Sequence, residues 1–294
     1  MRLSKKYQLP FNIKLVLLFL LTLLILCILY FGGKSDWKFS NKKESATMQA
    51  FLNIALEPLG TTMYVWGGGW NEEDTGLGAS SERIGISPAW ETFAKQQTSD
   101  YDFEDYRFER EKGLDCSGYI GWIVYNLFET EDNQEGYVVK STEMAENFAY
   151  RGWGTLIQNP KEFLVGDIVS MEGHVWICLG TCKDGSVLLI HSSPPGVSVC
   201  GTSLVEQKPF QDDNQNDTAD TNQSQNASQS QAVLLATKFM TMYYPNWQEK
   251  YPNREVPSSY LKEVSVMRWN HHTLSDAEEY QKLSAEEVIT QLEK

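Results

Sequence analysis

Residues 167–191 read DIVSMEGHVWICLGTCKDGSVLLIH, and this stretch decides the fold that the sequence predicts. It contains three short apolar segments, at 167–171, 174–179 and 186–191. The turn residues Glu172-Gly173 and Lys183-Asp184-Gly185 separate the segments. Apolar runs of this length between turn signals are typical of β-strands that follow one another in a sheet. The sequence therefore predicts a small antiparallel sheet at the centre of the domain.

Two of the four histidines lie in this stretch, each at an end of a predicted strand. His174 begins one strand and His191 ends the next, whereas His271 and His272 lie in a polar stretch near the C-terminus. Adjacent strands of one sheet would bring His174 and His191 together. Either imidazole is therefore a candidate partner for a nucleophile supplied by another part of the chain.

The candidate nucleophile is Cys116, in the segment LDCSG at 114–118. It lies at the start of a helix predicted over 117–128, with Asp115 as a candidate N-cap. Unpaired N–H groups at a helix N-terminus stabilise a thiolate, and the N–H group of Cys116 is placed to bind an oxyanion. We therefore expect Cys116 to attack a carbonyl, with its proton passing to a histidine.

Four short motifs follow one another along the chain: YVWGG at 64–68, DCSGYI at 115–120, VGDIV at 165–169 and GHVWI at 173–177. Together and in this order they resemble the signatures of NlpC/P60 cysteine peptidases. The resemblance covers about residues 45–200, with the predicted strand around Val266 as a last element. It implies an α+β, papain-like fold, in which a helix that carries the cysteine packs on a small antiparallel sheet.

The resemblance also implies the site residues. The catalytic triad would be Cys116 as nucleophile, His174 as general base and His191 as the polar third residue that orients His174. Ser192 or Ser193 stays open as an alternative third residue. The substrate cleft would be lined by Tyr64, Asp115 and Ser117, although Tyr64 is equally expected as a core aromatic and Asp115 as a helix cap.

The activity that the resemblance implies is hydrolysis of peptide bonds in peptidoglycan stem peptides, of the D,L-endopeptidase type and without a cofactor. An amidase or acyltransferase on the same scaffold stays open, because it would use the same nucleophile and base. A catalytically inactive scaffold that binds wall peptide is the alternative from a different class.

Two insertions depart from the family pattern within a catalytic domain predicted at 45–270. The first, at 71–113, is rich in acidic and aromatic residues, and we expect it to form a wall or lid beside the site. The second, at 211–231, consists almost entirely of Gln, Asn, Asp, Ser and Thr, and we expect it to be disordered. A helical C-terminal tail is predicted at 271–294.

The N-terminal region contains an uncharged, leucine-rich segment at 15–33. Its length suits a transmembrane helix, which would follow a cytoplasmic stub at 1–14 and precede a linker at 34–44. A cleaved signal peptide is the alternative, but small residues do not follow the segment. We expect a single-pass protein of the cell membrane in a bacterium, in particular a Gram-positive one, with the catalytic domain outside.

The net charge and the positions of the cysteines limit which partners, metal sites and disulfides are expected. The formal charge of −14, without clustered Lys and Arg outside the flanks of 15–33, makes nucleic acid an improbable partner. A zinc site is disfavoured, because His174 and Cys178 on one strand would lie about 13 Å apart. Cys182 and Cys200 either bridge a hairpin or stay reduced.

Overall fold

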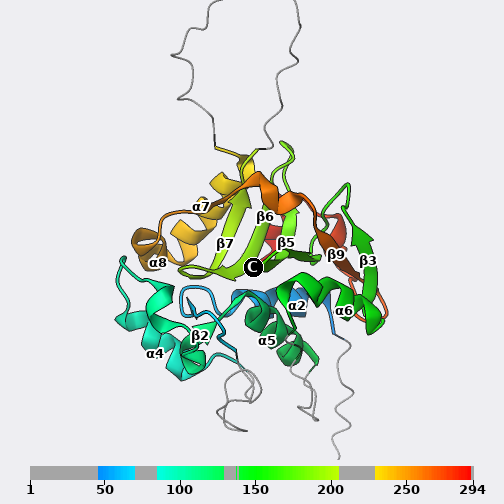
Figure 1. The fold of residues 1–294 in the computed structure, drawn as a ribbon. Coiled ribbons are helices and arrows are strands. Elements are labelled where there is room, and N and C mark those ends of the chain that lie inside the picture. Colours follow the sequence, from blue (N-terminus) through cyan, green and yellow to red (C-terminus); the bar gives the residue numbers. More distant parts are fainter. Residues whose placement is uncertain (1–45, 70–84, 129–136, 138, 205–228, 293–294) are drawn as a thin grey trace, which may run out of the picture. The chain divides into compact units, whose positions relative to one another are not determined.

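The computed structural model describes residues 46–69, 85–128, 137, 139–204 and 229–292. These belong to one of the two units into which the chain divides, Ser45–Lys294. Among the described residues, nine strands form one mixed sheet that curls into a half-barrel (Figure 1). The order is β2-β1-β7-β6-β5-β4-β9-β3, with β8 beside β7. The strands are β1 (Met63–Tyr64), β2 (Gly113–Leu114), β3 (Gly154–Gln158), β4 (Ile168–Met171), β5 (His174–Thr181), β6 (Val187–Ser193), β7 (Gly196–Thr202), β8 (Glu255–Val256) and β9 (Ser265–Trp269).

The helix that precedes the central strands, α5, is the most deeply buried one. It runs from Cys116 to Phe128, and 11 of its 13 residues are buried, as expected for a helix that is apolar on every side. It packs on β5 and β6 and against α2. The other α-helices of the described residues are α2 (Met48–Leu56), α4 (Pro88–Gln96), α6 (Met144–Tyr150), α7 (Gln231–Tyr243), α8 (Pro245–Lys250) and α9 (Ala285–Leu292).

The alternation of side chains along β5 divides the core in two. Val175 and Ile177 belong to the larger cluster, which the helices cover. Trp176 and Cys178 belong to a smaller cluster on the opposite face. Because residues two apart on a strand share a face, His174 points to the side of Trp176.

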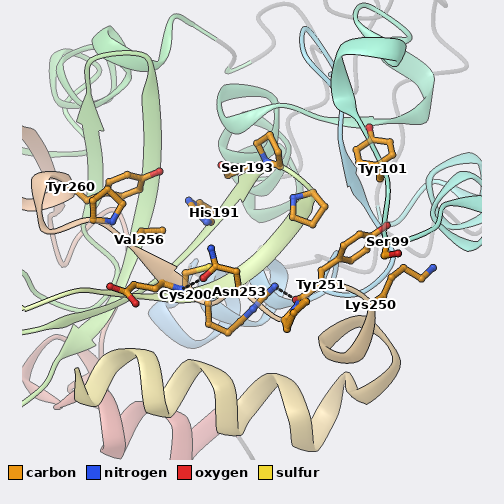
Figure 2. Close-up of a pocket in the computed structure, with 16 residues that line it drawn as sticks. Ser99, Tyr101, His191, Ser193, Cys200, Lys250, Tyr251, Asn253, Val256 and Tyr260 are labelled. Carbon is orange, nitrogen blue, oxygen red and sulfur yellow. Dashed lines mark hydrogen bonds between the residues drawn. The ribbon is translucent and has the colours of Figure 1, made fainter. Parts of the chain in front are cut away.

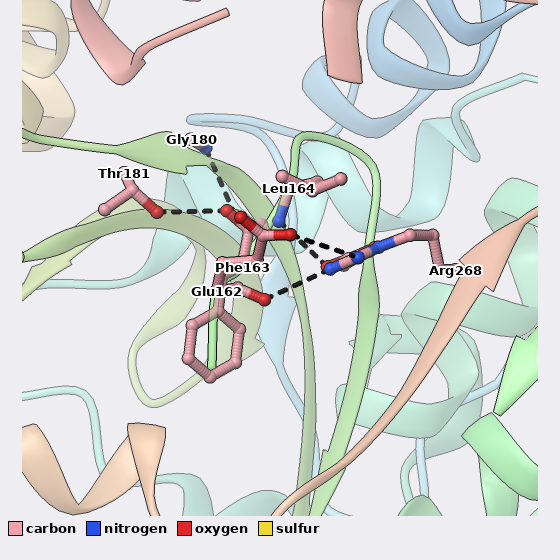
Figure 3. A network of polar contacts seen from close by, with 8 residues as sticks. Glu162, Phe163, Leu164, Gly180, Thr181 and Arg268 are labelled. Atoms are coloured by element: carbon pink, nitrogen blue, oxygen red, sulfur yellow. Dashed lines mark hydrogen bonds and ion pairs between the residues drawn. The ribbon is translucent and has the colours of Figure 1, made fainter. Parts of the chain in front are cut away.

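A buried ion pair joins β4 to β9. Arg268 donates to both carboxylate oxygens of Asp167, at 2.9 and 2.8 Å, and also to the carbonyl of Glu162 (Figure 3). The Asp167 side chain is fully buried and accepts a further bond from the Leu164 amide. The aspartate of the VGDIV motif therefore has a structural role, because it connects two strands through a bidentate contact.

The predicted papain-like fold class is wrong. The chain forms a nine-stranded curled mixed sheet instead of a small antiparallel one, with β1 parallel to β2 and β8 parallel to β7. The physical reason is strand length. β1, β2 and β8 contain two residues each, too few for an alternating pattern, so nothing local in the sequence indicates them.

The predicted single-pass membrane localisation is also contradicted. In the part of the chain that the structure describes, no helix is long and apolar enough to cross a membrane. The longest, α5 and α7, have 13 residues each, which corresponds to about 20 Å against a bilayer core of about 30 Å. The predicted span at 15–33 lies outside the described residues.

Candidate active site

Cys116 is buried at the first position of α5, and Asp115 caps this helix. Asp115 Oδ1 accepts hydrogen bonds from the Gly118 amide at 2.7 Å and from the Ser117 hydroxyl at 2.8 Å. The capping alternative for Asp115 is therefore observed. Asp115 and Ser117 contact each other beside the sulfur, and their expected role in binding substrate stays a prediction.

Glycines allow two backbone segments, 64–68 and 113–118, to meet around Cys116. The carbonyl of Gly68 accepts a hydrogen bond from the Asp115 amide at 3.2 Å. A Cβ atom at Gly118 would lie 2.4 Å from that carbonyl oxygen, and one at Gly68 would lie 2.5 Å from the carbonyl oxygen of Gly113. Any side chain at these positions would separate the segments, so the glycines of the YVWGG and DCSGYI motifs have a packing role.

His174 and His191 are brought together by the antiparallel pairing of β5 and β6. His174 Nε2 lies 2.9 Å from His191 Nδ1, and the rings meet edge to face. If His174 donates in this bond, its Nδ1 carries a lone pair and can accept a proton. If His191 donates instead, the proton of neutral His174 is on Nδ1. Only the first tautomer allows His174 to act as a base through Nδ1.

The backbone of β5 connects this histidine pair to the nucleophile. The Val175 amide donates toward the Cys116 sulfur, which brings the thiol to the residue that directly follows His174. The thiol and the imidazole are not hydrogen-bonded to each other. Contacts between catalytic groups are often long in an unliganded enzyme and shorten when substrate binds.

Burial keeps both groups neutral at rest. Burial, together with the negative charge of Asp115, raises the pKa of the Cys116 thiol to about 12. Burial lowers the pKa of His174 to about 4. The amides of Ser117 and Cys116 at the helix start lower the pKa of the thiol, as expected, but desolvation and the neighbouring Asp115 carboxylate outweigh them. The resting site is a thiol and an imidazole, not an ion pair.

Tyr64 lies beside the nucleophile and is covered by the first insertion. Its ring meets that of Phe103 edge to face at 5.4 Å, and its carbonyl accepts a hydrogen bond from the Tyr101 hydroxyl at 2.5 Å. Burial and the nearby Cys116 raise the pKa of Tyr64. The described part of the 71–113 insertion therefore forms a wall against Tyr64, while residues 70–84 lie outside the described part.

These positions bear on two of the open alternatives, Ser192 as the third catalytic residue and a disulfide between Cys182 and Cys200, whereas Ser193 as the third residue stays a prediction. Ser192 donates to the carbonyl of Leu114 at 2.7 Å, so its hydroxyl ties β6 to the nucleophile segment instead of contacting His174. Cys182 and Cys200 are both free and belong to core clusters on opposite faces of the sheet. A disulfide between them is excluded by this geometry.

Sequence reasoning missed Tyr260. Its ring lies 5.4 Å from that of His174 and 6.1 Å from that of His191, measured between centroids. Burial and the nearby Cys200 and Cys116 raise the pKa of Tyr260 to about 12. Tyr260 lies in the 3-10 helix η5 (Ser258–Leu261), far from the four motifs in sequence, so no local signal could have identified it.

No family model, curated protein or solved structure matches this chain. The resemblance to NlpC/P60 peptidases therefore rests on the four motifs and stays a hypothesis.

Proposed function

We propose that this chain is a cysteine hydrolase that cleaves peptide bonds in peptidoglycan stem peptides. One observation carries the proposal: the Cys116 thiol lies against the backbone amide of Val175, the residue that follows His174, and Nε2 of His174 is bound to a second histidine. This arrangement leaves Nδ1 of His174 as the atom that can receive the thiol proton. The stem peptide as substrate is supported only by the likeness of the motifs.

The reaction begins from the neutral pair. When a peptide carbonyl reaches the sulfur, the thiol proton moves to His174 Nδ1 and the sulfur attacks the carbonyl carbon. The amide of Cys116 has no partner within its own helix because Cys116 is the first helical residue, and in this mechanism it stabilises the oxyanion. His174 then gives the proton to the leaving amine, and a thioester forms.

Water completes the reaction. His174 Nδ1 accepts a proton from a water molecule, which attacks the thioester carbonyl. The carbon–sulfur bond then breaks, the acid product is released, and His174 returns the proton to the sulfur, which restores the neutral thiol. His191 stays neutral throughout and accepts the Nε2–H bond of His174, so it fixes the tautomer and orientation of the base. Neutral His191 does not stabilise imidazolium as a carboxylate would, which agrees with the low pKa of His174.

The test is release of fragments from purified peptidoglycan by the full-length chain, identified by mass. We expect the wild type and Cys182→Ala to release peptides with new amino termini, and Cys116→Ala to release none. Cys182 is a matched control because it is also a buried free cysteine but lies at the far end of β5 from His174. Equal release by Cys116→Ala and the wild type would refute the proposal.

A further inference from the structure

A cavity of about 530 Å³ opens beside the histidine pair. His191 and Tyr260 line one end of it, and Ser99 and Lys250 lie at the other (Figure 2). Its walls come from the first insertion and from the segment between α8 and β8. Two hydrogen bonds join these walls, from Lys250 Nζ to the Gln97 carbonyl and from the Tyr251 hydroxyl to the Thr98 carbonyl.

Arg254 lines this cavity as a buried cation without a counter-ion. Its side chain donates through Nη2 to the Tyr251 carbonyl, while Nε and Nη1 have no hydrogen-bond partner. Only 2% of the residue is exposed, and no carboxylate of the described residues lies within 4 Å of it. A buried guanidinium is costly unless an anion pairs with it.

Neighbouring side chains do not supply that anion. Burial raises the pKa of Cys200 to about 11, so this thiol is neutral at pH 7. Glu255 also lines the cavity, but it is exposed and makes no ion pair with Arg254. A second unpartnered group lies on the same face: the buried Ser198 hydroxyl, which is opposite His191 in the register of β6 and β7. Arg254 and Ser198 therefore hold buried donors that no group in the described part of the chain accepts from.

We propose that this cavity is a subsite for a carboxylate group of the substrate, with Arg254 as its counter-ion. The proposal rests on the proposed function, because it takes the ligand to be a peptide that also reaches Cys116. The planar guanidinium matches a carboxylate in shape and charge. Its unpartnered nitrogens are covered in the unliganded chain, so binding requires the guanidinium to turn into the cavity. Because His191 also lines the cavity, a carboxylate bound there would lie close to the histidine pair.

The test measures binding without turnover, in the full-length chain with Cys116→Ala. The probes are the tetrapeptide L-Ala-γ-D-Glu-L-Lys-D-Ala and two analogues, one with a carboxamide at D-Glu and one with a carboxamide at the C-terminus. We expect one amidation to weaken binding, measured by calorimetry, at least about 30-fold. The analogue that loses affinity identifies which carboxylate binds.

The second arm adds Arg254→Gln, which should weaken binding of the tetrapeptide to a similar degree and abolish discrimination against the amidated analogue. Lys262→Gln removes an exposed positive charge outside the cavity. It should change neither the affinity for the tetrapeptide nor the discrimination against the amidated analogue. If thermal unfolding shows that Arg254→Gln does not fold, Arg254→Lys is used. It keeps the charge without the planar fork, so discrimination should fall but persist.

Three results would overturn the proposal: no binding of the tetrapeptide, equal affinity for all three peptides, or unchanged discrimination in the Arg254 variant. Because binding is measured without hydrolysis, a wild-type chain that binds the tetrapeptide but releases no wall fragments would count against the proposed function alone.

Discussion

Gly118→Ala adds one methyl group at the closest backbone approach around the nucleophile. The new Cβ would lie 2.4 Å from the Gly68 carbonyl oxygen, so the two segments must separate by about 1 Å to restore ordinary contact. Overpacking of this kind costs about 1–3 kcal/mol. Loss of the hydrogen bond from Asp115 to Gly68 adds about 1 kcal/mol. Alanine gains up to about 1 kcal/mol in helix propensity. The net loss of unfolding free energy is therefore about 1–4 kcal/mol.

Gly185→Ala is the matched control for this variant. Gly185 has a φ of +82° in a hairpin turn, and a Cβ there would meet nothing within 4 Å. Alanine in this left-handed conformation costs about 1–2 kcal/mol, so urea unfolding should show a similar loss for both variants. The rate of Cys116 alkylation, followed by peptide mass, should rise severalfold only in Gly118→Ala, because separation of the segments uncovers the sulfur. If Gly118→Ala has the same unfolding free energy and the same alkylation rate as the wild type, this reasoning is refuted.

Three further predictions concern the proton path and the sheet. Because His174 must be neutral to accept a proton and its pKa is about 4, kcat/KM should fall as the pH drops through about 4; a limb centred at pH 6.5 in the pH profile would contradict this. His191→Ala should lower kcat about 100-fold, and His191→Asn, whose amide oxygen can still accept from Nε2, should retain more activity in a steady-state assay; equal rates would argue against an orienting role. Arg268→Met leaves the fully buried Asp167 unpaired and should lower the free energy of unfolding by about 3–5 kcal/mol in urea, and a loss below about 1 kcal/mol would show that the ion pair is not structural.

The local elements around the site could be predicted because each depends on a continuous pattern. The helix predicted at 117–128 is observed at Cys116–Phe128, and the three strands predicted within 167–191 correspond to β4, β5 and β6. Within the helical tail predicted at 271–294, α9 begins with a capping box, in which Ser284 and Glu287 make reciprocal backbone hydrogen bonds of 2.8 and 3.3 Å. Propensity, apolar period and turn residues act over a few positions, so the sequence alone specifies them.

The sheet architecture and several side chains around the site depend on contacts between segments that are distant in the sequence. The two-residue strands have no pattern of their own and exist only because neighbouring backbone pairs with them. Tyr260 and Arg254 reach the histidine pair from a segment that the motifs do not include. Such positions follow from how the chain closes on itself, which no local signal encodes.

The sequence by itself determined which groups are available for chemistry: a cysteine at a helix start and two histidines on neighbouring strands. The tertiary structure decided their state and surroundings. It brought His174 Nε2 to 2.9 Å from His191 Nδ1 and set the Cys116 thiol against the backbone next to His174. Burial keeps the thiol and the His174 imidazole neutral. The physical reason is that pKa and hydrogen-bond geometry depend on desolvation and on atoms from several segments, whereas helix and strand patterns depend on neighbours in the chain.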